Sequence, residues 1–233
     1  MTDRSVIDLN IKQIIDYQNQ HPELLQAHHF LYDKRYSNVE KCRYVLMGIN
    51  PGEGSSDWVE WPVQGVPAEE TSRFDFQKQR TENRSARRWR NTCQTMLNTL
   101  DISLTEMFFW SSKNVAELAD RYGNLKNSKH VEFCKNLNTS LIEYHDPVAV
   151  IVVGIGHLYR TLIPTAYQLE HIKTVPNASG HQVVAQFTDG RRPWIFCKHW
   201  TGARISAEET TAMRKSIREA STLRRTGEMS APA

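Results

Sequence analysis

Apolar residues are spaced along this chain in two ways, and each spacing predicts a different element. A short stretch in which nearly every residue is apolar predicts a buried strand, because it is too short for a helix and too apolar for a surface. The stretches of this kind are 44–49, 107–110 and 148–153. Two further apolar stretches, 183–187 and 194–197, flank Asp189-Gly190, a pair that suits a tight turn, and they predict a hairpin or two successive strands.

Other segments place apolar residues three or four positions apart, which is the spacing of one face of an amphipathic helix. The segments with this spacing are 5–27, 85–100, 131–141 and 206–220. In the last segment Ser206 followed by Glu209 is typical of a helix start. Strands alternating with helices predict an α/β fold, a three-layer α/β/α sandwich with a central, mainly parallel sheet of four or five strands. We expect a single domain at 1–220 and a flexible C-terminal tail at 221–233.

Polar residues follow three of the predicted strands directly. The first strand ends in Gly48-Ile49-Asn50-Pro51-Gly52, the second in Ser111-Ser112, and the last delivers His199 into a loop. In open α/β sheets, ligands bind in the crevice beyond the carboxyl ends of the strands. We therefore expect these polar side chains to meet at one edge of the sheet.

The chain has 233 residues and a net charge of only +3, so the distribution of charge says more than the total. From 53 to 70 every charged residue is acidic, whereas from 73 to 90 basic residues dominate. Such a basic block beside a predicted site suits contact with phosphates, and a solvated helix face is the alternative.

Several common site types lack their motifs in this sequence. The four cysteines stand far apart, without the C-x-x-C spacing of a zinc or iron–sulfur site. Gly154-Ile155-Gly156 has Tyr159 at the third glycine position of a dinucleotide fingerprint, and neither a phosphate loop nor a G-x-S-x-G elbow occurs. No N-terminal segment has the apolar length of a secretory signal or a membrane span. We expect a soluble, cytoplasmic monomer with no metal, no nucleotide cofactor and no membrane contact.

Two of the strand-end segments resemble a known family. Gly48-Ile49-Asn50-Pro51-Gly52 resembles the first motif of the uracil-DNA glycosylase superfamily, in the form found in its mismatch-specific thymine/uracil branch. Lys198-His199-Trp200-Thr201-Gly202-Ala203-Arg204 resembles the second motif, commonly His-Pro-Ser-x-x or Asn-Pro-Ser-Gly, with Trp200 where proline is usual and Thr201 where serine is. The resemblance spans roughly 44–206.

The resemblance implies a monofunctional DNA glycosylase, which extrudes a pyrimidine nucleotide from the duplex and hydrolyses its N-glycosidic bond to leave an abasic site. Asn50 would position the attacking water, and His199 would hydrogen-bond the pyrimidine O2 as negative charge develops there. The residues expected to line the base pocket are Gly48, Ile49, Pro51, Gly52, Glu53, Ser111, Ser112 and Asn114. Those expected to contact DNA are Arg84, Arg87, Arg88, Arg90, Thr201, Gly202, Arg204 and Ile205.

Small residues in this pocket bear on which base it takes. Strict uracil enzymes of the family carry a tyrosine where Gly52 stands, and many relatives have an asparagine where this chain has Ser111-Ser112, so a 5-substituent would fit here. The segment 53–79 has aromatic residues beside carboxylates, which would bind a sugar or form a small apolar core. Whether Glu53 or Asp57 supplies a base or is an exposed loop acid stays open.

Three functions therefore remain. The first is excision of a bulky 5-modified pyrimidine, for instance a glucosylated hydroxymethylcytosine of phage DNA, in bacterial defence. The second is repair of uracil or mismatched thymine. The third is a catalytically inactive member of the fold that binds nucleic acid.

Overall fold

A computed structural model describes residues 4–27, 30–37, 39–52, 84–200 and 204–226 of the chain. The helices are α1 (Arg4–Asn19), α4 (Arg84–Leu97), α5 (Val115–Tyr122), α6 (Lys129–His145), α7 (His157–Tyr167) and α8 (Ala207–Thr226), with short 3-10 turns η1 (Pro22–Gln26) and η2 (Leu125–Asn127). The strands are β1 (Lys34–Arg35), β2 (Tyr44–Gly48), β3 (Ile102–Glu106), β4 (Ala149–Val153), β5 (Glu170–Pro176), β6 (Gln182–Thr188) and β7 (Pro193–Cys197).

All seven strands form one sheet in the order β1-β3-β2-β4-β7-β6-β5. The four central strands, β3, β2, β4 and β7, are parallel, and the outer three are antiparallel to their neighbours. Of the two alternatives predicted for 183–197, a hairpin or two successive strands, the hairpin is correct. The strands β6 and β7 pair antiparallel around Asp189-Gly190, where Gly190 has a φ of 80°. Parallel central strands bring the carboxyl ends of β2, β3 and β7 to one edge of the sheet.

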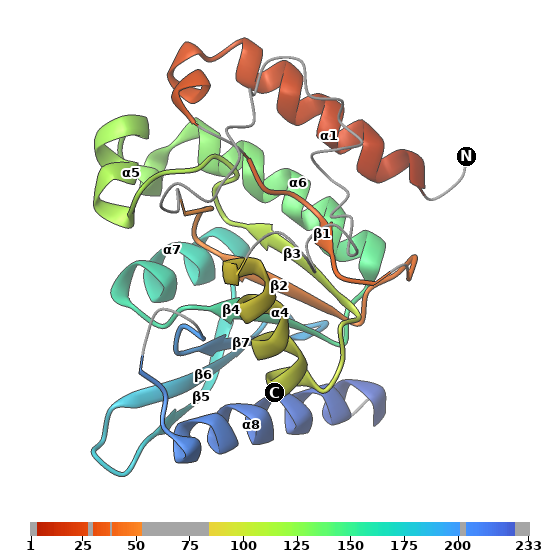
Figure 1. Ribbon diagram of the computed structural model, residues 1–233, viewed down its shortest axis with the longest axis vertical. Helices are drawn as coiled ribbons and strands as arrows, with labels where there is room; N and C mark the ends of the chain where they lie inside the picture. The colour runs from red at the N-terminus through yellow and green to blue at the C-terminus, as the bar shows by residue number, and fades with distance from the viewer. Residues whose placement is uncertain (1–3, 28–29, 38, 53–83, 201–203, 227–233) are drawn as a thin grey trace.

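Helices cover both faces of this sheet (Figure 1). On one face Val45 and Met47 of β2 lie in a core that includes Ile11 of α1 and Leu141 of α6. On the other face Leu46 lies in a second core with Cys93 of α4 and Met213 of α8. Because β2 is buried on both faces, its sequence is a continuous apolar run rather than an alternating one.

The predicted sheet of four or five strands is wrong in number. The prediction missed β1 because it has only two residues, both charged, and β5 because all its side chains but one are exposed. Neither strand therefore has the apolar pattern that marked the central ones.

The predicted strand at 107–110 is also wrong, since these buried residues follow β3 rather than form it. In β3 itself the buried positions Ser103 and Thr105 are polar, and their hydroxyls donate to Asp33 (2.7 Å) and Asn138 (2.6 Å). Hydrogen bonds thus replace apolar contacts on one face of β3. Its sequence is therefore not a continuous apolar run, and the prediction missed it.

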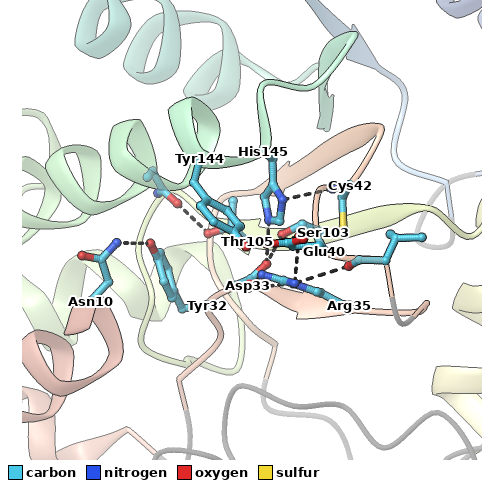
Figure 2. Close-up of polar contacts among 12 residues, drawn as sticks. Asn10, Tyr32, Asp33, Arg35, Glu40, Cys42, Ser103, Thr105, Tyr144 and His145 are labelled. Atoms are coloured by element: carbon cyan, nitrogen blue, oxygen red, sulfur yellow. Dashed lines mark hydrogen bonds and ion pairs between the residues drawn. The ribbon is translucent and has the colours of Figure 1, made fainter. Parts of the chain in front are cut away.

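A buried polar network joins β1 and β3 to the end of α6 (Figure 2). Asp33, whose side chain is 3% exposed, accepts hydrogen bonds from Ser103, from Nε2 of His145 (2.9 Å) and from Nε and Nη2 of Arg35 (2.9 and 2.6 Å). The other ring nitrogen of His145 accepts from the Cys42 backbone N–H (3.1 Å), so Nε2 carries the proton. This network fixes the edge of the sheet next to β2.

The helix predicted at 85–100 is α4, and the one predicted at 206–220 is α8, which extends to Thr226. Its predicted start is confirmed: Ser206 Oγ accepts from the Glu209 backbone N–H (3.1 Å), and Glu209 Oε2 accepts from the Ser206 N–H (3.0 Å). Among the described residues, no helix has the length and apolarity needed to cross a membrane.

Candidate active site

The chain segments after β2 and β3 run side by side beyond the strand ends. Backbone hydrogen bonds join Met107 N–H to Gly48 O (2.9 Å), Phe108 N–H to Ile49 O (2.8 Å) and Ser112 N–H to Pro51 O (3.1 Å). Gly52 and Ser112 then form an isolated parallel bridge. This register, which the sequence left open, places Ser112 beside Asn50.

The side-chain amide of half-buried Asn50 has a fixed orientation. Its Nδ2 donates to Ser112 Oγ and to Pro51 O, both at 2.9 Å. Ser112 in turn donates to the Asn114 backbone oxygen (2.8 Å), so it can only accept from Asn50. Both N–H groups of the amide are therefore used, and within the described part of the chain Oδ1 remains as an acceptor without a partner.

Two neighbouring residues that the sequence assigns to the pocket anchor the backbone instead. The Asn114 side chain caps α5 by accepting from the Glu117 N–H (2.9 Å). Buried Ser111 offers its carbonyl oxygen to the Tyr122 hydroxyl (2.8 Å) and to Arg121 (3.4 Å). These bonds tie the Ser111-Ser112 segment to α5, so that the partner of Asn50 is rigidly placed.

His199 stands at the same edge of the sheet, beyond β7. Its half-buried ring lies 6.1 Å from the Trp89 ring of α4, and burial lowers the pKa of the imidazole. Trp200, the departure from the family pattern, is buried in the core beneath α4 and α8, with its ring 5.9 Å from Trp89. An apolar core contact thus accounts for a tryptophan where a proline is usual.

The Glu209 carboxylate binds residues on both sides of the loop that carries His199, Lys198 before it and Ser206 after it. Lys198 Nζ lies 3.0 Å from both Oε1 and Oε2 of Glu209, the residue that also caps α8 with Ser206. The pKa of Glu209 is lowered by its backbone bond to Ser206 and by Lys198, so the ion pair persists at neutral pH. Ile205 packs against the same core and Arg204 is exposed, whereas Thr201 and Gly202 lie outside the described residues.

The remaining pocket residues surround the end of β2. Ile49 and Pro51 are buried, and Gly52 is exposed, with nothing described within 4 Å of where a Cβ would lie. Glu53 lies outside the described residues, as does Asp57. Among the described residues, none fills the space next to Gly52.

Gly48 reveals a residue that sequence reasoning missed. A Cβ on Gly48 would clash with Oε2 of Glu106, so the Glu106 carboxyl occupies the space above this glycine. Burial raises the pKa of Glu106 to about 8, against the effect of the Lys34 charge, and burial lowers the pKa of Lys34 to about 7. The residues around Glu106 in the sequence form no motif that marks it as a site residue. Only the register of β2 with β3 places it above Gly48.

Tyr159 of α7 packs against the same edge of the sheet. Its ring fills the space that a side chain on Gly154 would need, and its hydroxyl accepts a hydrogen bond from the Ile49 backbone. Burial, together with the charge of Glu106, raises the pKa of Tyr159 above its usual range. The glycine at 154 is thus explained by packing, without a nucleotide.

Basic residues of α4 lie near this edge because Trp89 of the same helix contacts His199. Arg87 and Arg88 are exposed and Arg90 is half-buried, while the side chain of Arg84 lies outside the described part. Among the described residues, no group of three or more His, Cys, Asp and Glu side chains could hold a metal ion.

Comparison with models of known protein families gives no match for this chain, and comparison with curated proteins gives none either. The relation to uracil-DNA glycosylases therefore rests on the two motifs and stays a prediction.

Proposed function

We propose that the protein is a monofunctional DNA glycosylase that hydrolyses the N-glycosidic bond of a flipped-out, 5-modified pyrimidine. The observation that carries this proposal is the fixed amide of Asn50, whose Nδ2 is held by Ser112 and Pro51 and whose Oδ1 is left as an acceptor at the sheet edge. A water molecule donating to this oxygen would be aimed at C1′ of the sugar. An amide is a poor base, so Asn50 orients the water and the proton goes to solvent.

His199 supplies the second part of the reaction. As the glycosidic bond breaks, its electron pair moves into the base, and negative charge develops on the pyrimidine O2. Neighbouring strands lie about 4.8 Å apart, so the ends of β2 and β7, which are separated by β4, are about 10 Å apart. A separation of this size would suit a pyrimidine held between Asn50 and His199. Because burial lowers the pKa of His199, its neutral ring donates an N–H at physiological pH.

DNA is the proposed partner because α4 carries Arg87 and Arg88 on its exposed side and reaches His199 through Trp89. With a net charge of +3, the affinity should be moderate and should fall steeply with salt. The four cysteines are buried and free, which suits a monomer that acts in a reducing cytoplasm.

The base is proposed to be bulky, for instance a glucosylated hydroxymethylcytosine of phage DNA. Support for room for a 5-substituent comes from Gly52, where no described residue lies within 4 Å of the position of a Cβ. Excision of such bases would convert modified phage genomes into abasic DNA, so the proposed biological role is antiviral defence.

Duplexes that carry uracil, a thymine mismatch or glucosylated hydroxymethylcytosine separate the alternatives. After incubation, released bases are identified by mass spectrometry and abasic sites by strand breakage in alkali. Release of the glucosylated base supports defence, and release of uracil or thymine supports repair. DNA binding without release of any base would contradict the enzyme and support a catalytically inactive binding protein.

A further inference from the structure

The Glu106 carboxyl lies at the proposed site but has no role in the reaction described so far. Glu106 ends β3 directly opposite Gly48 of β2, two residues before Asn50. Because an extended chain advances about 3.3 Å per residue, the carboxyl above Gly48 is at most about 7 Å from Asn50 along the chain. A pyrimidine ring spans a gap of this size.

The same carboxyl lies on the same face of the sheet as His199. Leu104 of β3 and Cys197 of β7 both belong to the core beneath α4 and α8. Side chains alternate along a strand, so Glu106 lies on the same face of the sheet as Leu104. By the same alternation, His199 lies on the same face as Cys197. The carboxyl stands above β2, so it is two strands, or about 10 Å, from β7. A base in this space could bond His199 on one side and Glu106 on the other.

Hydrogen bonding at Glu106 is incomplete. The Oε2 atom is buried and has no hydrogen-bond partner among the residues that the structure describes. The backbone oxygen, in contrast, accepts from Asn138 Nδ2 (2.8 Å), which fixes the strand end from the opposite face. Since buried polar atoms in folded proteins are nearly always hydrogen-bonded, this oxygen is placed to bind a ligand.

The carboxyl holds its proton at neutral pH, because burial raises its pKa to about 8. The charged and titratable groups that act on it are Lys34 of β1, which favours the ionised form, and Tyr159 of α7. A neutral carboxylic acid presents an O–H donor beside a carbonyl acceptor.

We propose that Glu106 is a catalytic acid that protonates N3 of the departing base, and that this base belongs to the cytosine class. Cytosine presents an N3 acceptor next to an N4 amino donor, and the neutral carboxyl matches both: its O–H donates to N3 and its carbonyl oxygen accepts from the amino group. The inference rests on the proposed glycosylase function and narrows its substrate.

The departing bases differ in how well they carry negative charge, which explains why cytosine bases need an acid and uracil and thymine do not. Without a proton, cytosine leaves as an anion with one carbonyl group to share the charge, whereas a uracil or thymine anion spreads its charge over two carbonyl groups. In uracil and thymine N3 already carries a proton. N3 therefore offers no free lone pair that Glu106 could protonate. The acid therefore accelerates release of cytosine derivatives selectively.

All atoms and charges balance in this step. The C1′–N1 bond breaks and its electron pair stays on N1, while the Glu106 proton moves to N3, so the base leaves neutral. The water positioned by Asn50 bonds to C1′ and its proton passes to solvent. Glu106 then regains a proton from solvent, and the net change is hydrolysis to a free base and an abasic site.

The test compares two duplexes that differ only at C4 of the base, one with 5-hydroxymethylcytosine and one with 5-hydroxymethyluracil, in single-turnover release. Glu106→Gln keeps the shape of the side chain but has no acidic proton. General acids contribute about 10²- to 10⁴-fold, so we expect cytosine release to fall at least about 100-fold and uracil release to change less than about 3-fold. Glu132→Gln, which changes an exposed glutamate of α6, should leave both rates unchanged.

A second variant moves the acid without removing it. Gly48→Ala places a methyl group where the carboxyl lies and should slow cytosine release more than uracil release. In the wild type, release of the cytosine base should fall as the pH rises through about 8, and Glu106→Gln should lose this dependence.

The outcomes separate the inference from the function on which it rests. Equal losses on the two duplexes, or release of only the uracil base by the wild type, would overturn the role of Glu106 and leave a glycosylase. Release of no base by the wild type from these two duplexes, or from the uracil, mismatched-thymine and glucosylated duplexes described above, would overturn the glycosylase itself.

Discussion

Replacing Asp33 by alanine tests the buried network that fixes the edge of the sheet beside the site. Asp33 accepts four hydrogen bonds, from Ser103, His145 and two nitrogens of Arg35. In Asp33→Ala the Ser103 hydroxyl and the His145 Nε2–H stay buried without an acceptor. Each such group costs about 1–3 kcal/mol. The Arg35 side chain is 25% exposed and can be rehydrated, so it adds about 0–1 kcal/mol.

The expected loss in the free energy of unfolding is therefore about 4 kcal/mol, a large part of the about 5–15 kcal/mol by which domains are stable. In a chain of this length, each kcal/mol lowers Tm by about 2–4 °C, so Tm should fall by about 8–16 °C. Thermal and urea unfolding followed by circular dichroism measure both quantities. Asp120→Ala, on the exposed side of α5, is the matched control and should change Tm very little.

The Asp33 network also determines how the mutations combine and how stability depends on pH. Asp33→Ala with Ser103→Ala should cost less than the sum of the single changes, because the orphaned hydroxyl is then gone. Burial raises the pKa of Asp33, but bonds from His145 and Arg35 outweigh it, so the folded pKa is below the unfolded one. The wild type should lose this stability as the pH falls through that lowered pKa, and Asp33→Ala should lack the loss. If Asp33→Ala lowered the unfolding free energy by less than about 1 kcal/mol, the network would be refuted. Strict additivity of Asp33→Ala and Ser103→Ala would refute it too.

Three further predictions concern the proposed reaction. Ser112→Ala removes one neutral hydrogen bond to Asn50, worth about 0.5–1.5 kcal/mol, and should lower the single-turnover rate about 2- to 10-fold with unchanged DNA affinity. His199→Ala should lower that rate about 10²- to 10³-fold, and His199→Gln, which keeps an N–H donor, should lose less; equal losses would contradict the hydrogen bond to O2. Arg87→Ala with Arg88→Ala should flatten the dependence of log affinity on log salt by about 0.9 per lost phosphate contact, measured by fluorescence anisotropy, and an unchanged slope would place DNA elsewhere.

Much of the fold could be predicted from the sequence wherever burial requires apolar side chains. The strands β2 and β4 are buried on both faces, so their sequences are continuous apolar runs. The start of α8 was predictable because the reciprocal bonds of Ser206 and Glu209 are local. The predictions failed where polar groups are buried by pairing, as at Ser103 in β3, since such bonds depend on residues far away in sequence.

The same distinction applies to the site. Asn50 and His199 could be singled out because each follows an apolar strand, and parallel strands deliver their ends to one edge. Glu106 could not be, because its position above Gly48 depends on the register of β2 with β3. Asn114 was assigned to the pocket, but its side chain caps α5, since an asparagine three residues before Glu117 is also a typical helix cap.

In the proposed reaction, Asn50 orients the water that attacks the sugar. The most direct measurement is single-turnover base release by the wild type and by Asn50→Ala, with DNA affinity measured on the same duplex. Asn124→Ala, which changes an exposed asparagine that caps η2, serves as the control. We expect Asn50→Ala to release base at least about 100-fold more slowly while it binds DNA as tightly as the wild type. Full activity of Asn50→Ala would contradict the account.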